Sequence, residues 1–260
     1  MGTSANKPNI RFGGFGGDWE RRKLGDLVDV CRGRDYKHLS EGDIPVYGTG
    51  GYMLSVSEAL SYDKDAIGIG RKGTIDKPYI LNAPFWTVDT LFYAIPREKV
   101  DLNFAFDIFQ NIDWKKKDES TGVPSLSKTA INEIDILVPQ YDEQQALGQF
   151  FNGIDNLITL QQRKLEALKE TKKAMLQKMF PQEGQTAPEV RFKGFSDAWE
   201  QRKLASLCEK FTDGDWIESK DQSDFGVRLV QTGNVGVAEY LDKPNNKKWI
   251  SEDTFDRLHC

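Results

Sequence analysis

The sequence predicts an α+β protein in which a mixed, β-rich domain is followed by one long helix and by the start of a second, similar domain. Three observations lead to this prediction. A 17-residue phrase occurs twice, short apolar runs are separated by glycine, proline and aspartate as far as Pro139, and a regular heptad pattern follows.

The repeated phrase is "RFGGFGGDWERRKLGDL" at residues 11–27 and "RFKGFSDAWEQRKLASL" at residues 191–207, and ten of the 17 positions agree. A spacing of 180 residues is far longer than the roughly 20–50 residues of a solenoid unit. The phrase therefore indicates a duplicated domain. Because Phe15 and Trp19 recur in it, we interpret them as packing residues.

The first copy of the domain contains apolar and aromatic runs that are typical of strands joined by turns. These runs read "DIPVYGTGGYML", "AIGIG", "PYIL", "FWTVDTLFYAIP" and "IDILVP". We expect Trp86 and Trp114 to be core or rim residues rather than stacking platforms. The predicted divisions are a first domain over 10–141, a helix over 142–180, a linker over 181–190 and an incomplete second domain over 191–260.

The helix is predicted from ten positions that alternate steps of four and three residues, of which eight are apolar. Gln161 and Lys172 are the two polar exceptions. A helix lying on its own domain stays an alternative, but the regular 3.5-residue spacing favours a coiled coil. The apolar positions of this seam are Leu147, Phe151, Ile154, Ile158, Leu165, Leu168, Met175 and Met179.

The stretch "GIGRKGT" from Gly68 to Thr74 contains a G-x-G-x-x-G pattern. A dinucleotide site requires a helix directly afterwards, and a triphosphate loop requires lysine after its last glycine. Neither follows here, because a strand-like run with Pro78 comes next and Thr74 holds the lysine position. The stretch predicts a tight loop that carries two cations and a hydroxyl toward a phosphate or base, or a plain hairpin turn with solvated charges.

The composition provides no sign of catalysis, metal binding or membrane insertion. Cysteines at 31, 208 and 260 and histidines at 38 and 259 lack metal-ligand spacing, and no nucleophile motif occurs. No apolar run is long enough for a membrane helix or signal peptide, so we expect a cytoplasmic protein. The net charge of −5 does not exclude nucleic acid, since local cation clusters decide such binding.

Taken together, the duplicated phrase, "IGRKGTID", "FWTVDTLFY" and the helix text from "LVPQYDEQQ" to "LQKMF" resemble the specificity subunit of Type I restriction-modification enzymes. The resemblance covers essentially residues 10–260. It implies two target-recognition domains, each followed by a long helix, with the two helices packed antiparallel as a spacer. Each domain would read one half of a split DNA site. The second domain departs from the family pattern because it is cut at Cys260, so we expect it not to read its half-site.

The resemblance also implies partners and roles. Double-stranded DNA is the ligand, and the methyltransferase and restriction subunits are the protein partners. The chain itself would be a non-catalytic subunit without cofactors. S-adenosylmethionine, ATP and Mg²⁺ are expected on the partner subunits, and the assembled complex would be a Type I site-specific deoxyribonuclease and adenine methyltransferase that serves host defence.

Base reading is expected from loops, because strands hold their polar edges in ladders. The candidate DNA-binding residues are Arg71, Lys72, Thr74, Tyr47, Thr49, Tyr52 and Lys128. Because the helix would have no mate in its own chain, we also expect a homodimer through its seam. Two alternatives stay open: a coiled-coil adaptor or inactive remnant that binds only methyltransferase subunits without reading DNA, and an enzyme, a methyltransferase or nuclease, in its own right.

Overall fold

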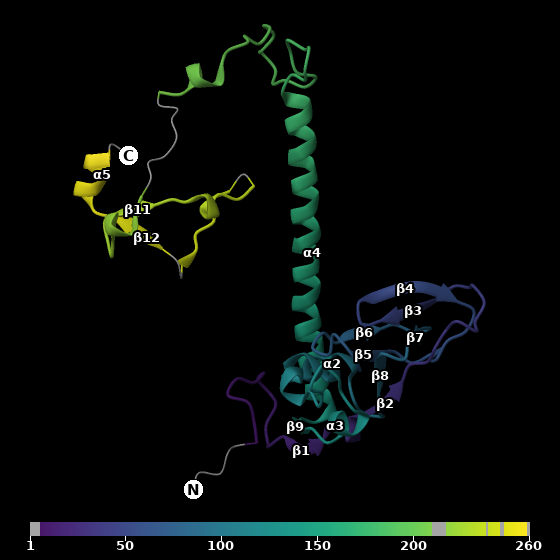
Figure 1. Ribbon diagram of the computed structural model, residues 1–260. Helices are drawn as coiled ribbons and strands as arrows, with labels where there is room; N and C mark the ends of the chain where they lie inside the picture. Colours follow the sequence, from purple (N-terminus) through teal and green to yellow (C-terminus); the bar gives the residue numbers. More distant parts are fainter. Residues whose placement is uncertain (1–5, 210–216, 238, 245–246, 259–260) are drawn as a thin grey trace. The chain divides into compact units, whose positions relative to one another are not determined.

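The computed structural model describes residues 6–209, 217–237, 239–244 and 247–258. The chain forms two compact units, Met1–Lys172 and Lys173–Cys260. The α+β class predicted from the sequence is confirmed, and all five apolar runs predicted as strands contain strands. Figure 1 shows the strands of the first unit beside the lower end of the long helix α4.

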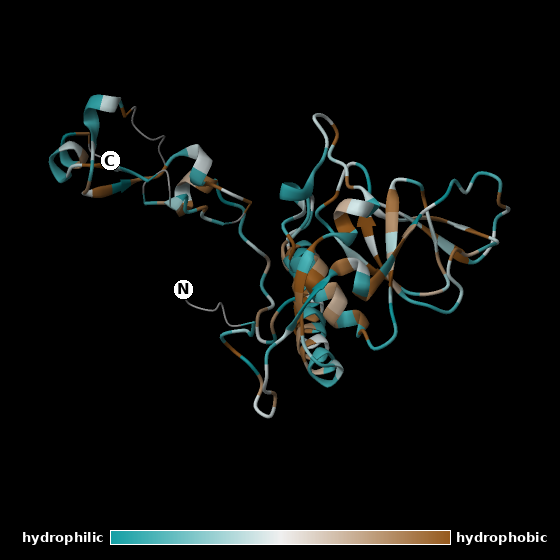
Figure 2. Ribbon diagram, turned by 90° about the horizontal axis from the view of Figure 1, so that it is seen from below, coloured by the Kyte–Doolittle hydropathy of each residue, from teal (hydrophilic) through white to brown (hydrophobic). Residues whose placement is uncertain are grey.

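The first unit is built on an antiparallel sheet with the strand order β2-β8-β5-β6. Its strands are β2 (Val28–Arg32), β5 (Ala66–Gly70), β6 (Tyr79–Leu81) and β8 (Leu91–Pro96). All five residues of β5 are buried, so this central strand is covered on both faces. Hydrophobic residues concentrate in the inner strands and helices of the unit, whereas its outer loops are hydrophilic (Figure 2).

One face of this sheet packs against the largest apolar cluster of the unit, which includes residues of three helices. These are α1 (Leu24–Leu27), α2 (Leu102–Asn111) and α3 (Lys128–Asn132), with a short 3-10 helix η1 at Trp114–Lys117. The sequence analysis did not predict α2. Its apolar period spans only ten residues, although Asp101 caps it by accepting from the Phe104 amide.

A smaller sheet with the order β4-β3-β7 completes the domain. Its strands are β3 (Ile44–Gly48), β4 (Gly51–Val56) and β7 (Trp86–Thr87), with β3 and β7 parallel. Val46, Val56, Trp86 and Val88 form its buried cluster. Trp86 is 4% exposed and Trp114 is 2% exposed, so both are core residues, in agreement with the prediction that they are core or rim residues.

The first copy of the repeated phrase is tied to the end of the domain. Its strand β1 (Glu20–Lys23) pairs antiparallel with β9 (Asp135–Val138), the strand that precedes the long helix. Arg11 donates from Nε and Nη2 to the two carboxylate oxygens of Glu143, at 2.6 Å each. The N-terminal segment therefore closes the domain against the first turn of the helix.

The long helix α4 runs from Tyr141 to Met179, and its 39 residues span about 58 Å. It begins and ends one residue earlier than the sequence predicts. Glu143, Gln144 and Gly148 are buried in its first turns, and Leu147 packs against the core of the domain. From Phe150 onward most side chains of the helix are exposed.

The second unit holds a small sheet with the order β10-β12-β11. The Asp221 carboxylate and the Arg257 guanidinium form an ion pair at 2.6 Å, and the Arg228 guanidinium lies 5.6 Å from the Trp249 ring centroid. Its elements are η2 (Leu204–Leu207), η3 (Ser219–Asp221), β10 (Gln222–Ser223), β11 (Val227–Leu229), η4 (Thr232–Asn234), β12 (Lys248–Ile250) and α5 (Glu252–Leu258). Cys260 and His259 lie outside the described residues.

Candidate nucleic-acid interface

Loops that carry cations and hydroxyl groups meet at the turn between β7 and β8, residues 87–90. The glycine loop docks on it through Arg71, whose amide donates to the Thr90 carbonyl at 2.8 Å and whose Nη1 donates to the Asp89 carbonyl at 3.1 Å. The Val88 amide donates to the Tyr47 carbonyl at 3.0 Å, which attaches the β3–β4 hairpin. The turn thus holds two predicted DNA-binding segments side by side.

The backbone conformation of the glycine loop requires glycine at two positions, Gly70 and Gly73. A Cβ on Gly70 would overlap the Thr74 carbonyl oxygen, and Gly73 has a φ of +89°. The loop is clamped from the other side, because Gly73 donates to the Pro124 carbonyl at 2.9 Å and Leu126 donates to the Arg71 carbonyl at 3.0 Å. The Lys72 side chain projects from this fixed loop and is exposed.

The segment that clamps the glycine loop is itself organised by Asp118. One carboxylate oxygen of Asp118 accepts hydrogen bonds from the Ser120 amide, the Ser120 hydroxyl and the Ser125 amide, at 2.8–3.0 Å. These hydrogen bonds hold the pKa of Asp118 below its usual value. These hydrogen bonds therefore fix the conformation of the loop over 118–126.

The tyrosines predicted at the hairpin form a small aromatic group. Tyr47 packs edge-on against Tyr52, with ring centroids 6.4 Å apart, and lies 6.1 Å from Tyr79. Burial raises the pKa of the Tyr79 hydroxyl, which donates to the Gly48 carbonyl at 2.7 Å. Tyr52 is 63% exposed, so its ring is free to contact a ligand, while Thr49 at the hairpin turn is half-buried.

The family model of the Type I restriction modification DNA specificity domain matches residues 16–170, which include this surface and most of α4. The chain belongs to this family. It is 26% identical over 252 residues to the specificity subunit of the Type I restriction enzyme MjaVIII from Methanocaldococcus jannaschii. That match covers 85% of this chain and 56% of the subunit, so the chain spans a little over half of that relative's length.

The fold of the specificity domain is also similar to a solved structure. The crystal structure of the S subunit of a Type I restriction-modification system from M. genitalium superimposes with a TM-score of 0.54 at 13% identity. The superposition covers 88% of this chain and 63% of that chain. This likeness concerns the fold.

Sequence reasoning missed a further loop of the specificity domain, residues 33–38, which carries Arg34, Lys37 and His38. The Arg34 amide donates to the Thr87 carbonyl at 2.8 Å, and Trp86 Nε1 donates to the Arg34 carbonyl at 2.9 Å. A Cβ on Gly33 would overlap the Val88 carbonyl oxygen. The signal in the sequence was "RGRDYKH", a run of cations around one glycine directly after a strand.

Some basic side chains of the domain already have a carboxylate partner, and others do not. Lys115 contacts Asp76 at 2.8 Å and holds the pKa of that carboxyl below its usual value. Lys128, at the start of α3, lies 3.6 Å from Asp29 of the edge strand β2. Arg34, Arg71 and Lys72 form no ion pair with a described carboxylate.

The described residues provide neither a metal site nor a membrane-spanning helix. Within residues 6–209 and the described stretches beyond, no group of three His, Cys, Asp or Glu side chains is placed to hold a metal ion. The helices of that part of the chain include none that is long and apolar enough to cross a membrane. Thr74 is half-buried in the glycine loop, where its carbonyl faces Gly70.

Proposed function

We propose that this chain reads the sequence of one half of a bipartite DNA site, as the non-catalytic specificity subunit of a Type I restriction-modification enzyme. The observation that carries the proposal is the meeting of three loops at residues 87–90, where Arg34, Arg71 and Lys72 have no described carboxylate partner. Arginine on a fixed loop suits bidentate contacts to guanine, and lysine suits phosphate.

The proposal includes the partners that the family implies. Methyltransferase and restriction subunits would dock on the chain and supply the S-adenosylmethionine, ATP and Mg²⁺ sites. Residues 10–141 would be the target-recognition domain, residues 142–180 the spacer, and residues 191–260 the start of a second recognition domain. Membership of the DNA specificity family supports this division of roles.

We further propose that α4 pairs with the α4 of a second copy. Six of the predicted seam residues on this helix are between 37% and 57% exposed, which leaves a long apolar face in water. A two-fold dimer with antiparallel helices would cover this face and place two identical readers at a fixed distance. It would favour a palindromic split site.

The DNA-reading proposal is tested by finding the target and then removing the contacts. Methylome sequencing of cells that express the chain with its methyltransferase partner identifies the split motif, and binding is then measured on duplexes with and without it. We expect Arg71→Ala to weaken binding to the motif by about 5- to 150-fold, as for one bidentate base contact. Lys72→Ala should weaken motif and non-motif binding alike and lower the salt slope by about one.

Arg22→Ala is the matched control, because Arg22 is an exposed cation already paired with Glu20 at 2.6 Å. It should leave the affinity unchanged. If the wild-type chain binds no duplex at low salt but still binds methyltransferase subunits, the adaptor function replaces DNA reading. Equal affinities of wild-type and Arg71→Ala protein would remove the glycine loop from the interface.

A further inference from the structure

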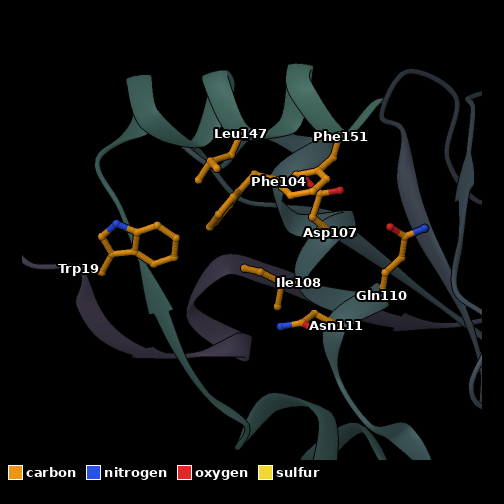
Figure 3. Close-up of a pocket in the computed structure, with 8 residues that line it drawn as sticks. All are labelled: Trp19, Phe104, Asp107, Ile108, Gln110, Asn111, Leu147 and Phe151. Carbon is orange, nitrogen blue, oxygen red and sulfur yellow. The ribbon is translucent and has the colours of Figure 1, made fainter. Parts of the chain in front are cut away.

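An open groove of about 430 Å³ lies between α2 and the first turns of α4, away from the loops at residues 87–90. Figure 3 shows its apolar walls, to which α4 contributes Leu147 and Phe151 and α2 contributes Phe104 and Ile108. The lining residues are Trp19, Phe104, Asp107, Ile108, Gln110, Asn111, Leu147 and Phe151.

The carboxylate of Asp107 lies in this apolar groove without an ion-pair or hydrogen-bond partner among the described residues. Asp107 points toward Phe151 (Figure 3), and its Oδ2 is buried without a hydrogen-bond partner among the described residues. Burial, followed by the charges of Asp155 and Asp101, raises the pKa of Asp107 to about 7. No ion pair to Asp107 or Asp155 occurs in the described part of the chain. An occupant that brought a cation would remove this cost.

The groove opens onto the exposed seam of α4. Phe151 is 43% exposed and Ile154 is 37% exposed, and Asp155 follows them on the same helix. An apolar wall continued by an apolar helix face fits a second helix better than a small ligand, because a helix can cover both surfaces at once.

The seam itself indicates how that second helix would lie. Its steps of four and three residues read the same from either end, so an antiparallel copy can be laid on it with every seam position matched. In that register Phe151 faces Met175 of the second copy, and Ile154 faces its Lys172. Lys172 is one of the two polar residues that interrupt the seam, and the register places it beside Asp155.

We propose that the groove receives Lys172 and Met175 from α4 of a second copy of this chain, with the Lys172 ammonium group bound between Asp155 and Asp107. The inference rests on the proposed homodimer and assigns its register. Met175 fills the apolar part of the groove next to Phe151, where a flexible thioether packs well on an aromatic ring. The two-fold axis generates the same contact twice, so one pair of sequence positions specifies antiparallel pairing at both ends of the interface.

Charge reversal in the full-length chain tests the pairing, with the dissociation constant of the dimer measured by sedimentation equilibrium. Asp155→Lys and Lys172→Glu should each raise this constant at least about tenfold, because each places like charges together in two symmetric contacts. The variant that carries both substitutions restores the pair with reversed sign. It should return to within about threefold of the wild-type dissociation constant.

Glu170→Lys combined with Lys172→Glu is the matched control, because Glu170 is an exposed acid of the same helix that does not face Lys172 in this register. It should not rescue the dimer. Circular dichroism and thermal melting verify that each variant is folded. The pairing is overturned if the dissociation constant of the variant with both Asp155→Lys and Lys172→Glu does not recover, or if that of the control recovers equally. Neither result contradicts the homodimer.

Failure of the homodimer itself gives a different result. A wild-type chain that is monomeric at tens of micromolar, or a dimer that survives Ile158→Asp together with Leu165→Asp, overturns both the homodimer and the pairing. Neither outcome affects DNA reading by the loops at residues 87–90, which is measured separately.

Discussion

The two copies of the repeated phrase share a local conformation and differ in burial. In the first copy Leu24 and Leu27 are fully buried, whereas their counterparts Leu204 and Leu207 are each 64% exposed. The difference teaches that this phrase specifies its own shape but not its own environment, because the segments that cover it lie far away in the chain.

The shared shape is visible at several equivalent positions. Gly14 and Gly194 have φ angles of +95° and +98°. Arg11 donates to the Gly17 carbonyl and Arg191 to the Asp197 carbonyl, at 2.6 and 2.7 Å. The pairs Arg22–Glu20 and Arg202–Glu200 are also alike, at 2.6 Å in each copy. All these contacts span six residues or fewer, so the local sequence is sufficient to form them.

The partners of the first copy come from residues far later in the chain. β1 pairs with β9, and Arg11 binds Glu143, 132 residues away. The described residues contain no equivalent strand or glutamate contact for the second copy. Trp19 packs edge-on against Phe104 of α2, whereas Trp199 packs against Phe180, with ring centroids 6.4 and 5.6 Å apart.

The largest expected difference in stability between the copies comes from the equivalent leucines Leu27, which is buried, and Leu207, which is exposed. Leu27→Ala should lower the free energy of unfolding of the first unit by about 2–5 kcal/mol, because it leaves a cavity in a packed core. Leu207→Ala, at 64% exposure, should change stability by no more than about 0.5 kcal/mol. Urea denaturation followed by tryptophan fluorescence measures both. Similar losses in the two variants would show that the second copy is also packed.

The ion pair of the first copy should give a smaller difference. The Glu143 side chain is 2% exposed, and Glu143→Gln removes the charge that binds Arg11 while keeping the shape. We expect a loss of about 1–3 kcal/mol in the free energy of unfolding, because the guanidinium keeps only weaker contacts in a partly buried site. Arg191→Ala should have no measurable effect in the same urea titration. A loss at Arg191 would reveal a partner for the second copy.

The smallest effect concerns the groove against which Trp19 packs. Asp107 has a pKa raised to about 7 in the folded chain, above the ordinary value of about 3.9 for an unfolded chain. Its ionisation therefore destabilises the fold, with no cost below about pH 4 and the full cost above about pH 7.

In the monomeric chain, at protein concentrations well below the dissociation constant of the dimer, Asp107→Asn should accordingly stabilise the first unit by about 1 kcal/mol at pH 8, after allowance for solvent screening of a partly exposed group, and much less at pH 5. Thermal melting at the two pH values measures the change. Asp256→Asn, on an exposed position of α5, is the control and should show no such pH dependence. A gain that is equal at both pH values would mean that Asp107 is not titrating in this range.

Much of the fold followed from short-range patterns. The heptad spacing predicted the long helix, and its predicted range of 142–180 agrees with α4 to within one residue at each end. The glycine- and proline-bounded runs located the strands β3 to β9. The short helix α2 was missed because ten residues give a weak period. Leu147 was assigned to the seam, and it packs on the core of its own domain, because α4 begins inside that domain.

The candidate interface was predicted less completely. The glycine loop and the tyrosine hairpin were found from their composition, and the loop carrying Arg34 was not. Lys128 was chosen from its place after a turn, yet it lies beside Asp29, 99 positions earlier in the sequence. Neutralisation of a cation depends on which distant carboxylate the fold brings within 4 Å, and no local pattern reports it.

The sequence by itself determined the duplicated phrase, its turns, the long helix and the glycine loop, because each depends on backbone preferences and hydrogen bonds among residues close in the chain. The tertiary structure decided which copy of the phrase is buried and which cations near residues 87–90 have no carboxylate partner among the described residues. It also brought Asp107 close enough to Asp155 for their charges to interact. Those properties depend on contacts between segments brought together only by the sheet and α4, and burial and electrostatic interactions act through space rather than along the chain.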